Sequence, residues 1–258
     1  MNVWQSIFFG LIQGFTEFLP VSSSGHLLLV SALTGVECPL FMSVMLHVGT
    51  LFAVIIAYRK PLLQILRHPI SDKRLLYLVI ASIPTFIIAA AVKFFLPEGI
   101  DKYILPVGFA LTAALLLLSS LNKNKFSVGE KGVLPLLITG VAQGMACFAG
   151  LSRSGATICT MSLFDIKREE SGEFSFLLSI PVILAGAAVE LIEAFATSAE
   201  INWGSVSIGV VAAFFAGLLA IGIVQKALKN ADFKWFAFYM PVPVSYTHLR
   251  AHETGAYL

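Results

Sequence analysis

Six long stretches of the sequence contain no Asp, Glu, Lys or Arg at all. They are residues 38–58, 75–92, 103–122, 132–152, 174–189 and 201–225. Most approach or exceed the ~20 residues that a helix needs to cross the hydrocarbon core of a bilayer. Only 12% of the residues are charged, against roughly 25% in soluble proteins, and the mean hydropathy is +0.87. We therefore predict an all-α, polytopic membrane protein, and we exclude a soluble or disordered chain.

The charge balance and the cysteines exclude further classes. Seventeen basic and 15 acidic residues give a net charge of +2, which offers no large positive field for nucleic acid. The three cysteines, Cys38, Cys147 and Cys159, form no paired motif and are interpreted as apolar packing residues. The first residues contain no basic segment, so no cleavable signal peptide is predicted.

Lys and Arg side chains are concentrated in four connections, at residues 59–74, 122–131, 165–170 and 226–234. The positive-inside rule places such loops in the cytoplasm. With this orientation, every loop fits spans at 41–58, 75–96, 104–121, 174–194 and 205–225. A last span that is cut short near residue 240 brings the expected number of transmembrane helices to about six.

Two segments do not fit simple spans. Residues 1–34 and 132–165 must each return to the side from which they enter, and each has a polar turn near its middle. Irregular backbone at membrane depth is tolerated only inside protein or along a cavity. We predict two re-entrant helical hairpins, although tight pairs of spans would satisfy the same loop pattern.

The polar turns belong to an internal repeat. Residues 10–25 recur 130 positions later with seven identities in 16 positions, in the pattern G-x-x-Q-G-x-x-x-F-x-x-x-S-x-S-G. Three predicted spans separate the copies, so the second copy enters from the opposite face. This is typical of an inverted-topology repeat with broken helices near the midplane. We predict one membrane domain, residues 1–240, with repeats at about 1–121 and 132–240.

The turn of the second hairpin carries a phosphate-binding pattern. Arg153 lies in an apolar run, where a charge is costly and its default interpretation is functional. A guanidinium matches phosphate oxygens with a planar fork of donors. Small and hydroxyl-bearing residues around it complete the predicted cradle: Ser152, Ser154, Gly155 and Thr157. The alternative is a structural arginine that pairs with Glu17 and holds the two hairpins together.

The turn of the first hairpin supplies complementary groups. Glu17 is the only carboxylate in residues 1–36 and is suited to bind a divalent metal or to move a proton. His26 lies close enough in sequence to act as a base for a neighbouring hydroxyl. The candidate nucleophiles are Ser22, Ser23 and Ser24.

Two further polar residues allow alternative assignments in sequence. His47 lies on the first predicted span and is interpreted as a hydrogen-bonded packing residue rather than a catalytic one. Glu173 precedes an apolar run and is either a helix-end carboxylate or a partner of Arg153.

These motifs resemble the motifs of a known family. Residues 13–26 and 150–157 resemble the first two signatures of the undecaprenyl-diphosphatase family of the bacitracin-resistance type, and residues 173–181 are similar to a third segment. The resemblance implies a bacterial plasma-membrane phosphatase that converts undecaprenyl diphosphate to the monophosphate with a divalent cation, Mg²⁺ or Ca²⁺. It also implies recycling of the lipid carrier for cell-wall synthesis and bacitracin tolerance.

The resemblance assigns roles residue by residue. The family's acidic motif falls on Gln13 and Glu17, its serine on Ser23, its histidine on His26 and its arginine on Arg153. Many members have glutamate at the position of Gln13, so we assign the acid role to Glu17 and leave Gln13 as a second metal ligand. The remaining turn residues are expected to bind phosphate: Ser22, Ser24, Gly25, Ser152, Ser154, Gly155 and Thr157. The partners implied are a polyprenyl diphosphate and the bilayer, and homodimerisation is left open.

Other functions fit parts of the pattern. Inverted repeats are also typical of transporters, so a lipid-phosphate flippase is the alternative. An intramembrane serine protease would use Ser24 and a histidine, but peptide cleavage does not require Glu17 and Arg153 together. If the chain is a phosphatase, the nucleophile is either Ser23 or a water molecule that Glu17 or His26 activates.

The C-terminal residues 241–258 depart from the family. They contain Pro241, Pro243 and a polar, charged stretch, which cannot complete a span. We expect a non-native tail here rather than a genuine polar one.

Overall fold

The computed structural model describes residues 1–95, 101–120, 125–196, 201–230, 233 and 235–245. Within these ranges the regular structure is helical, apart from one isolated β-bridge between Phe126 and Ile166. Four described helices are long and apolar enough to cross a membrane: α3 (Leu40–Ala57), α5 (Lys73–Phe95), α9 (Arg168–Ala196) and α10 (Trp203–Lys229). The predicted all-α, polytopic membrane class is confirmed. The number of spans stays a prediction, because α6 (Asp101–Ser119) is shorter in its described apolar part.

Two helix boundaries differ from the predicted ones. Helix α9 begins at Arg168 rather than near residue 174, and Glu169 and Glu170 in its first turn favour this start because they oppose the positive helix end. The basic connection 59–74, interpreted as a loop, contains helix α4 (Arg59–Arg67). Its Ile65 is buried against the core. The helix is short and amphipathic, and its several basic residues made the segment resemble a polar loop in the sequence.

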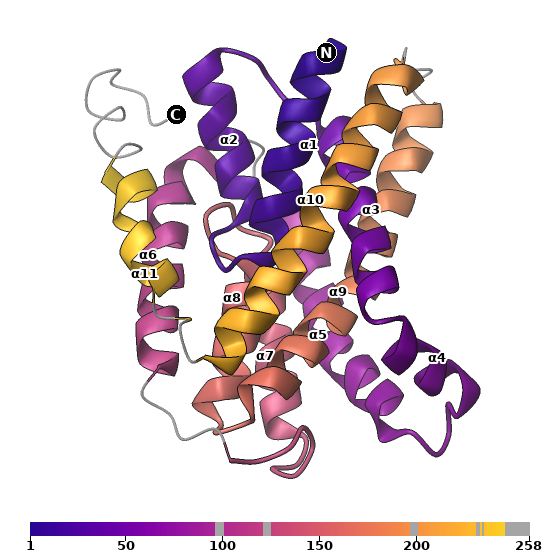
Figure 1. Ribbon diagram of the computed structural model, residues 1–258, viewed down its shortest axis with the longest axis vertical. Coiled ribbons are helices and arrows are strands. Elements are labelled where there is room, and N and C mark those ends of the chain that lie inside the picture. The colour runs from indigo at the N-terminus through magenta and orange to yellow at the C-terminus, as the bar shows by residue number, and fades with distance from the viewer. Residues whose placement is uncertain (96–100, 121–124, 197–200, 231–232, 234, 246–258) are drawn as a thin grey trace.

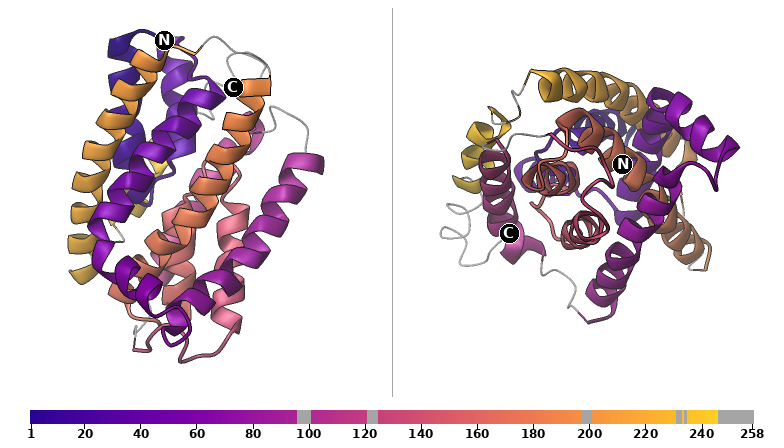
Figure 2. Two further views of the ribbon diagram at one scale, coloured as in Figure 1. Left: turned by 90° about the vertical axis from the view of Figure 1, so that its right-hand side faces the viewer. Right: turned by 90° about the horizontal axis from the view of Figure 1, so that it is seen from below.

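The two predicted hairpins are pairs of helices joined by turns. The first consists of α1 (Val3–Phe18) and α2 (Ser23–Thr34), and the second of α7 (Leu134–Met145) and α8 (Arg153–Leu163). Figure 1 shows α1 and α2 entering from the upper end and α7 and α8 from the lower end, with their turns near the middle. Helix α8 lies inside the surrounding helices (Figure 2). Residues 154–162 of this helix are all buried.

Glycines allow the first arm of each hairpin to pack closely on a long helix. A Cβ at Gly10 of α1 would collide with the carbonyl oxygen of Gly209 on α10, and one at Gly140 of α7 with the carbonyl oxygen of Ala81 on α5. Small residues at i and i+4 are the usual means of close helix contact in membranes. These glycines therefore place both hairpins against the long helices.

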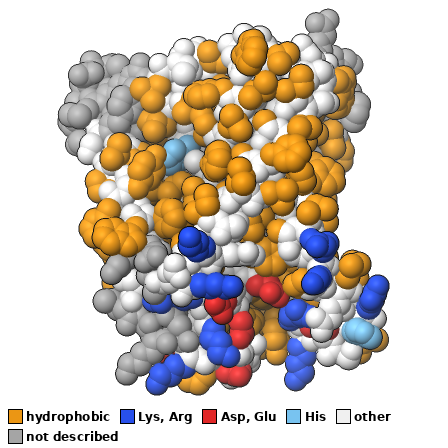
Figure 3. All heavy atoms as spheres, in the orientation of Figure 1, with side chains coloured by type: hydrophobic (Ala, Val, Ile, Leu, Met, Phe, Trp, Pro, Cys, Tyr) orange, Lys and Arg blue, Asp and Glu red, His pale blue; other side chains and the backbone are white. Residues whose placement is uncertain are grey.

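Charged side chains gather at one end of the molecule. In Figure 3, Lys, Arg, Asp and Glu lie mainly at the lower end, and the visible face above them is largely hydrophobic. Arg74 joins Asp72 (2.6 Å) and Glu173 (3.3 Å) there. Glu173 is thus a helix-end carboxylate, and its alternative assignment as a partner of Arg153 is wrong. The positive-inside rule predicts that this end faces the cytoplasm.

The C-terminal part returns along the bundle. Helix α11 (Trp235–Tyr239) packs against α6, and residues 241–245 are also helical. Residues 246–258, the greater part of the predicted non-native tail, lie outside the described residues.

Candidate active site

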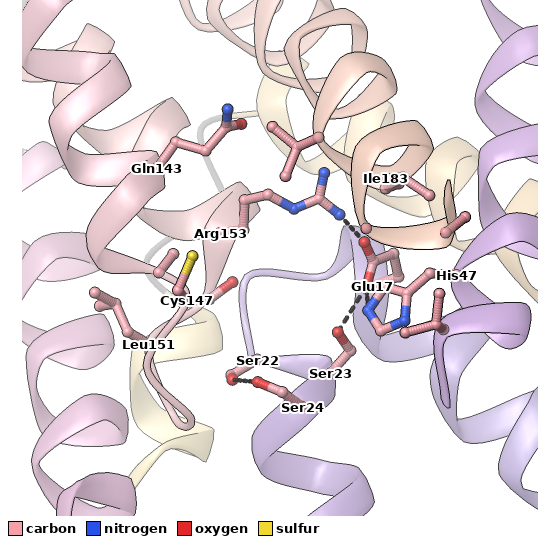
Figure 4. Close-up of a pocket in the computed structure, with 16 residues that line it drawn as sticks. Glu17, Ser22, Ser23, Ser24, His47, Gln143, Cys147, Leu151, Arg153 and Ile183 are labelled. Carbon is pink, nitrogen blue, oxygen red and sulfur yellow. Dashed lines mark hydrogen bonds and ion pairs between the residues drawn. The ribbon is translucent and has the colours of Figure 1, made fainter. Parts of the chain in front are cut away.

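A cavity of about 260 Å³ lies where the two hairpin turns meet. Figure 4 shows the side chains of both turns pointing into it, with those of α3 and α9 on the opposite wall. Its polar lining consists of Glu17, Ser22, Ser23, Ser24, His47, Gln143, Ser152 and Arg153. The tertiary fold therefore brings most of the predicted catalytic groups together, although they come from segments about 130 residues apart.

Glu17 and Arg153 form an ion pair that joins the two hairpins (Figure 4). Glu17 lies in the last turn of α1, and Arg153 is the first residue of α8. The Glu17 side chain is 2% exposed and that of Arg153 is 18% exposed. Arg153 thus remains accessible from the cavity, and an anion that enters can compete with the carboxylate for its guanidinium.

Oε2 of Glu17 organises the first turn. It accepts hydrogen bonds from Oγ of Ser23 (2.6 Å) and from Nε2 of Gln13 (2.8 Å). Bonds to a carboxylate are short and strong, so Ser23 is held in one orientation with its proton toward a base. The hydroxyl of Ser22 accepts from the backbone N–H of Gly25, which starts α2 at Ser23.

The structure does not place His26 beside Ser23. Nδ1 of His26 lies 2.7 Å from the carbonyl oxygen of Ser22, and Nε2 lies 2.8 Å from the hydroxyl of Tyr239. Both ring nitrogens are therefore engaged, and His26 does not line the cavity. The base nearest to Ser23 is Glu17, which corrects the predicted Ser23–His26 pairing.

His47 of α3, interpreted from sequence as a packing residue, lies in the site. Its Nε2 is 3.4 Å from Oε2 of Glu17, and its Nδ1 donates to the carbonyl oxygen of Ser43 at 2.8 Å. The sequence does contain a signal for His47. A titratable side chain within a predicted span is by default a functional candidate, as Arg153 is. What the sequence did not indicate was the rotation of α3 that turns His47 toward Glu17.

The predicted phosphate ligands separate into two groups. Those that line the cavity are Ser22, Ser24 and Ser152. Those that lie instead in the contacts between helices are Gly25, Ser154, Gly155 and Thr157. Thr157, for example, is fully buried and its hydroxyl lies 2.5 Å from that of Ser175 on α9, while a Cβ at Gly25 would collide with Phe109. For this second group phosphate binding stays a prediction, and in the structure their small size serves the close approach of the hairpins.

The opposite wall of the cavity is apolar and was not predicted. It consists of Val44 of α3 and of Val182, Ile183, Gly186 and Ala187 of α9. A Cβ at Gly186 would meet no atom within 4 Å, so this position leaves open space. An apolar wall facing charged and hydroxyl groups suits a ligand with a polar head and a hydrocarbon chain.

A family model described as "Bacitracin resistance protein BacA" matches residues 6–243. The chain belongs to the BacA family. Relatives named undecaprenyl-diphosphatase, from Treponema denticola and Carboxydothermus hydrogenoformans, are 36% identical over 253 and 247 residues, covering 93% of this chain and 94% of each relative. A Bacillus thuringiensis relative, undecaprenyl-diphosphatase 4, is 35% identical over 260 residues, covering 96% of this chain and all of the relative. The family resemblance of the sequence motifs is confirmed.

The site of this BacA-family chain has oxygen atoms suited to a hard cation. Oε1 of Gln13 and Oε1 of Gln143 are buried without a hydrogen-bond partner, and Oε1 of Glu17 has only the ion pair with Arg153. Among the described residues, no three His, Cys, Asp or Glu side chains gather into a metal cluster. These donors fit an ion that takes one carboxylate and one amide from the protein and its other ligands from phosphate, as Mg²⁺ commonly does.

Proposed function

We propose that this protein hydrolyses undecaprenyl diphosphate to undecaprenyl phosphate and inorganic phosphate in the bacterial plasma membrane. The observation that carries the proposal is a serine hydroxyl, hydrogen-bonded to a carboxylate, that faces an arginine within one intramembrane cavity. The names of the relatives support the lipid diphosphate as substrate. The product is the lipid carrier of cell-wall synthesis, and its recycling raises tolerance to bacitracin.

Binding begins with Arg153. The terminal phosphate of the substrate takes the place of Glu17 as a partner of the guanidinium, because a bidentate phosphate contact is at least as favourable as the carboxylate contact. Hydroxyl groups of Ser24 and Ser152 line the same cavity and donate to further phosphate oxygens. The prenyl chain lies along the apolar wall of α9.

Ser23 then attacks the terminal phosphorus. Its Oγ forms the new bond to phosphorus, and its proton passes to Oε2 of Glu17, which already accepts it in a hydrogen bond. The bond between phosphorus and the bridging oxygen breaks, and undecaprenyl phosphate leaves with the electron pair. Arg153 stabilises the charge that develops on the phosphoryl oxygens.

A water molecule completes the reaction. Glu17 first gives the proton that it took from Ser23 to the departing undecaprenyl phosphate, and it then accepts a proton from the water that attacks the phosphoserine. The bond between phosphorus and Oγ of Ser23 breaks, Oγ takes the proton back from Glu17, and inorganic phosphate leaves. A divalent cation held by Glu17, Gln13 and phosphate oxygens would neutralise charge on the diphosphate. The alternative in which water attacks the substrate directly is tested by trapping a phosphorylated Ser23.

We further propose that the two halves form an inverted repeat. Helices α2 and α8 begin at Ser23 and Arg153, and α5 and α10 begin at Lys73 and Trp203, each pair 130 positions apart. The hairpin arm α1 packs on α10, whereas α7 packs on α5, so equivalent arms contact equivalent helices of the other half. This exchange supports a pseudo-twofold axis near the cavity.

The decisive experiment measures phosphate release by the purified full-length protein in detergent, with undecaprenyl diphosphate, with and without a chelator. We expect one phosphate per lipid, and a loss of about a hundredfold or more for Ser23→Ala. A phosphorylated Ser23 peptide after acid quenching supports the covalent route. Lipid binding without phosphate release would contradict the proposal and favour transport.

A further inference from the structure

The backbone before Ser23 is held in a conformation that side chains rarely adopt. Ser22 has φ 67° and ψ 101° and is buried, and it is one of two non-glycine residues with positive φ among those described. Such a conformation persists only where surrounding contacts determine it. Because Ser22 directly precedes Ser23, its conformation sets the direction in which the Ser23 hydroxyl points.

His26 supplies these contacts. Both its backbone N–H (3.1 Å) and its ring Nδ1 (2.7 Å) lie in hydrogen-bond range of the carbonyl oxygen of Ser22. A carbonyl oxygen only accepts, so Nδ1 carries the proton, and in the neutral ring Nε2 is an acceptor. One side chain thus anchors the strained peptide through a defined tautomer.

Tyr239 completes the arrangement from the C-terminal helix α11. Its hydroxyl lies 2.8 Å from Nε2 of His26 and donates to it, and the two rings stack with centroids 5.6 Å apart. The next residue, Met240, is fully buried against Val21 and Phe109, which ties α11 to the same turn. A hydrogen bond to one ring nitrogen orients the other.

The internal repeat contains a natural comparison. The residue equivalent to Ser22 is Ser152, whose φ of −71° and ψ of 121° are ordinary extended values. The residue equivalent to His26 is Ala156, which has no side chain that could hold a carbonyl group. Of the two repeat copies, only the first has the histidine. It is also the copy in which the turn is strained and the strained residue directly precedes the proposed nucleophile.

We propose that Tyr239 is a positioning residue, which acts through His26 and the Ser22 carbonyl to aim the Ser23 hydroxyl at Glu17. The inference rests on the proposed phosphatase function and adds to it a residue outside the hairpins and the cavity. It also gives His26 a positioning role that does not require contact with the substrate.

The test compares Tyr239→Phe with Tyr58→Phe in the full-length protein. Each variant removes one tyrosine hydroxyl that forms a hydrogen bond between helices. The hydroxyl of Tyr58 accepts a hydrogen bond of 3.0 Å from Nε2 of Gln225, and Tyr58 does not line the cavity. We expect Tyr239→Phe to lower kcat about fivefold to tenfold, the range for one lost hydrogen bond, with KM nearly unchanged. Tyr58→Phe should leave both constants near those of the wild type. An unchanged kcat in Tyr239→Phe, or an equal loss in the control, would overturn the proposal.

A second variant tests the route through His26. In a His26→Asn background the partner of Tyr239 is absent, so adding Tyr239→Phe should cost less than about twofold more. Independent, multiplying losses would show that Tyr239 does not act through His26.

Hydrogen exchange gives a readout that does not depend on turnover. Peptides covering residues 19–26 should exchange faster in Tyr239→Phe and at the wild-type rate in Tyr58→Phe. If the wild-type protein releases no phosphate, the proposed function alone is contradicted. If hydrogen exchange of these peptides is unchanged in Tyr239→Phe, the positioning role is contradicted.

Discussion

Oγ of Ser23 donates to Oε2 of Glu17 over 2.6 Å, and Nε2 of Gln13 donates to the same oxygen at 2.8 Å. The shared acceptor places the proposed nucleophile and its base in contact before any substrate enters. The other carboxylate oxygen faces Arg153, so a single side chain connects both hairpin turns. Changes at Glu17 and its partners should therefore affect chemistry more than folding.

Glu17→Gln keeps the shape of the side chain but removes the proton acceptor and the charge. We expect phosphate release to fall about a hundredfold or more, because the base for Ser23 is lost. The measurement is the rate of phosphate release, with thermal stability recorded in parallel. A wild-type rate would make Glu17 a structural group.

Arg153→Lys keeps a positive charge but loses the planar fork of donors. We expect turnover to fall at least tenfold while the protein still inserts and purifies, because Lys binds phosphate as a point charge only. Retention of most of the activity would support the structural alternative, in which Arg153 only holds the two hairpins together through Glu17.

Gln13→Glu adds a carboxylate beside Glu17. The variant should remain active, and half-maximal activity should be reached at a lower divalent-cation concentration, since a second anionic oxygen is available to the ion. Titration of phosphate release with Mg²⁺ and Ca²⁺ after chelator treatment checks this expectation. An unchanged cation response would remove Gln13 from the proposed cation ligands.

Gly186→Leu should fill open space in the apolar wall of the cavity. We expect a rise in KM for a prenyl diphosphate of about tenfold, because the added side chain competes with the hydrocarbon chain. Gly222→Leu is the matched control, since a Cβ there also meets no atom within 4 Å but the position does not line the cavity. Equal KM values in the two variants would contradict the assignment of this wall to the lipid chain.

Cysteine labelling tests the orientation in the membrane. In a background without the native cysteines, Ser71→Cys and Lys131→Cys at the charged end should react only with reagent in the cytoplasm. Glu37→Cys and Gly204→Cys at the opposite end should react only from outside. Labelling of Ser71→Cys and Glu37→Cys from one side would contradict the proposed topology and the inverted repeat.

Much of the site could be predicted because its groups lie at breaks in otherwise apolar helices. Glu17 and Ser23 flank one polar turn, and Arg153 begins the helix after the other. A charge or hydroxyl cluster at membrane depth is costly, and such residues stand out in an apolar sequence. The repeat added the expectation of broken helices near the midplane, and the structure brings the two turns into one cavity.

The arrangement differs from the expected one where the position of a side chain depends on helix rotation. Thr157 and Ser152 are both hydroxyl residues near Arg153, yet Ser152 lines the cavity and Thr157 bonds to α9. His26 is close to Ser23 in sequence, but its place on α2 directs the ring toward Tyr239, 213 residues away. Neighbours in sequence share a site only if the helix presents them on the same face.

Sequence alone determined the membrane class, the two polar turns that interrupt apolar segments, and the identities of Glu17, Ser23 and Arg153 as candidate site residues. The reason is that the bilayer penalises charge and open backbone so strongly that few arrangements satisfy such a pattern. Only the tertiary structure decided that His47, the α9 wall and Tyr239 surround or support these groups. In the sequence, apolar and aromatic residues that face lipid, the protein core or the cavity have the same composition. Only the packing of the helices shows which of these environments each residue faces.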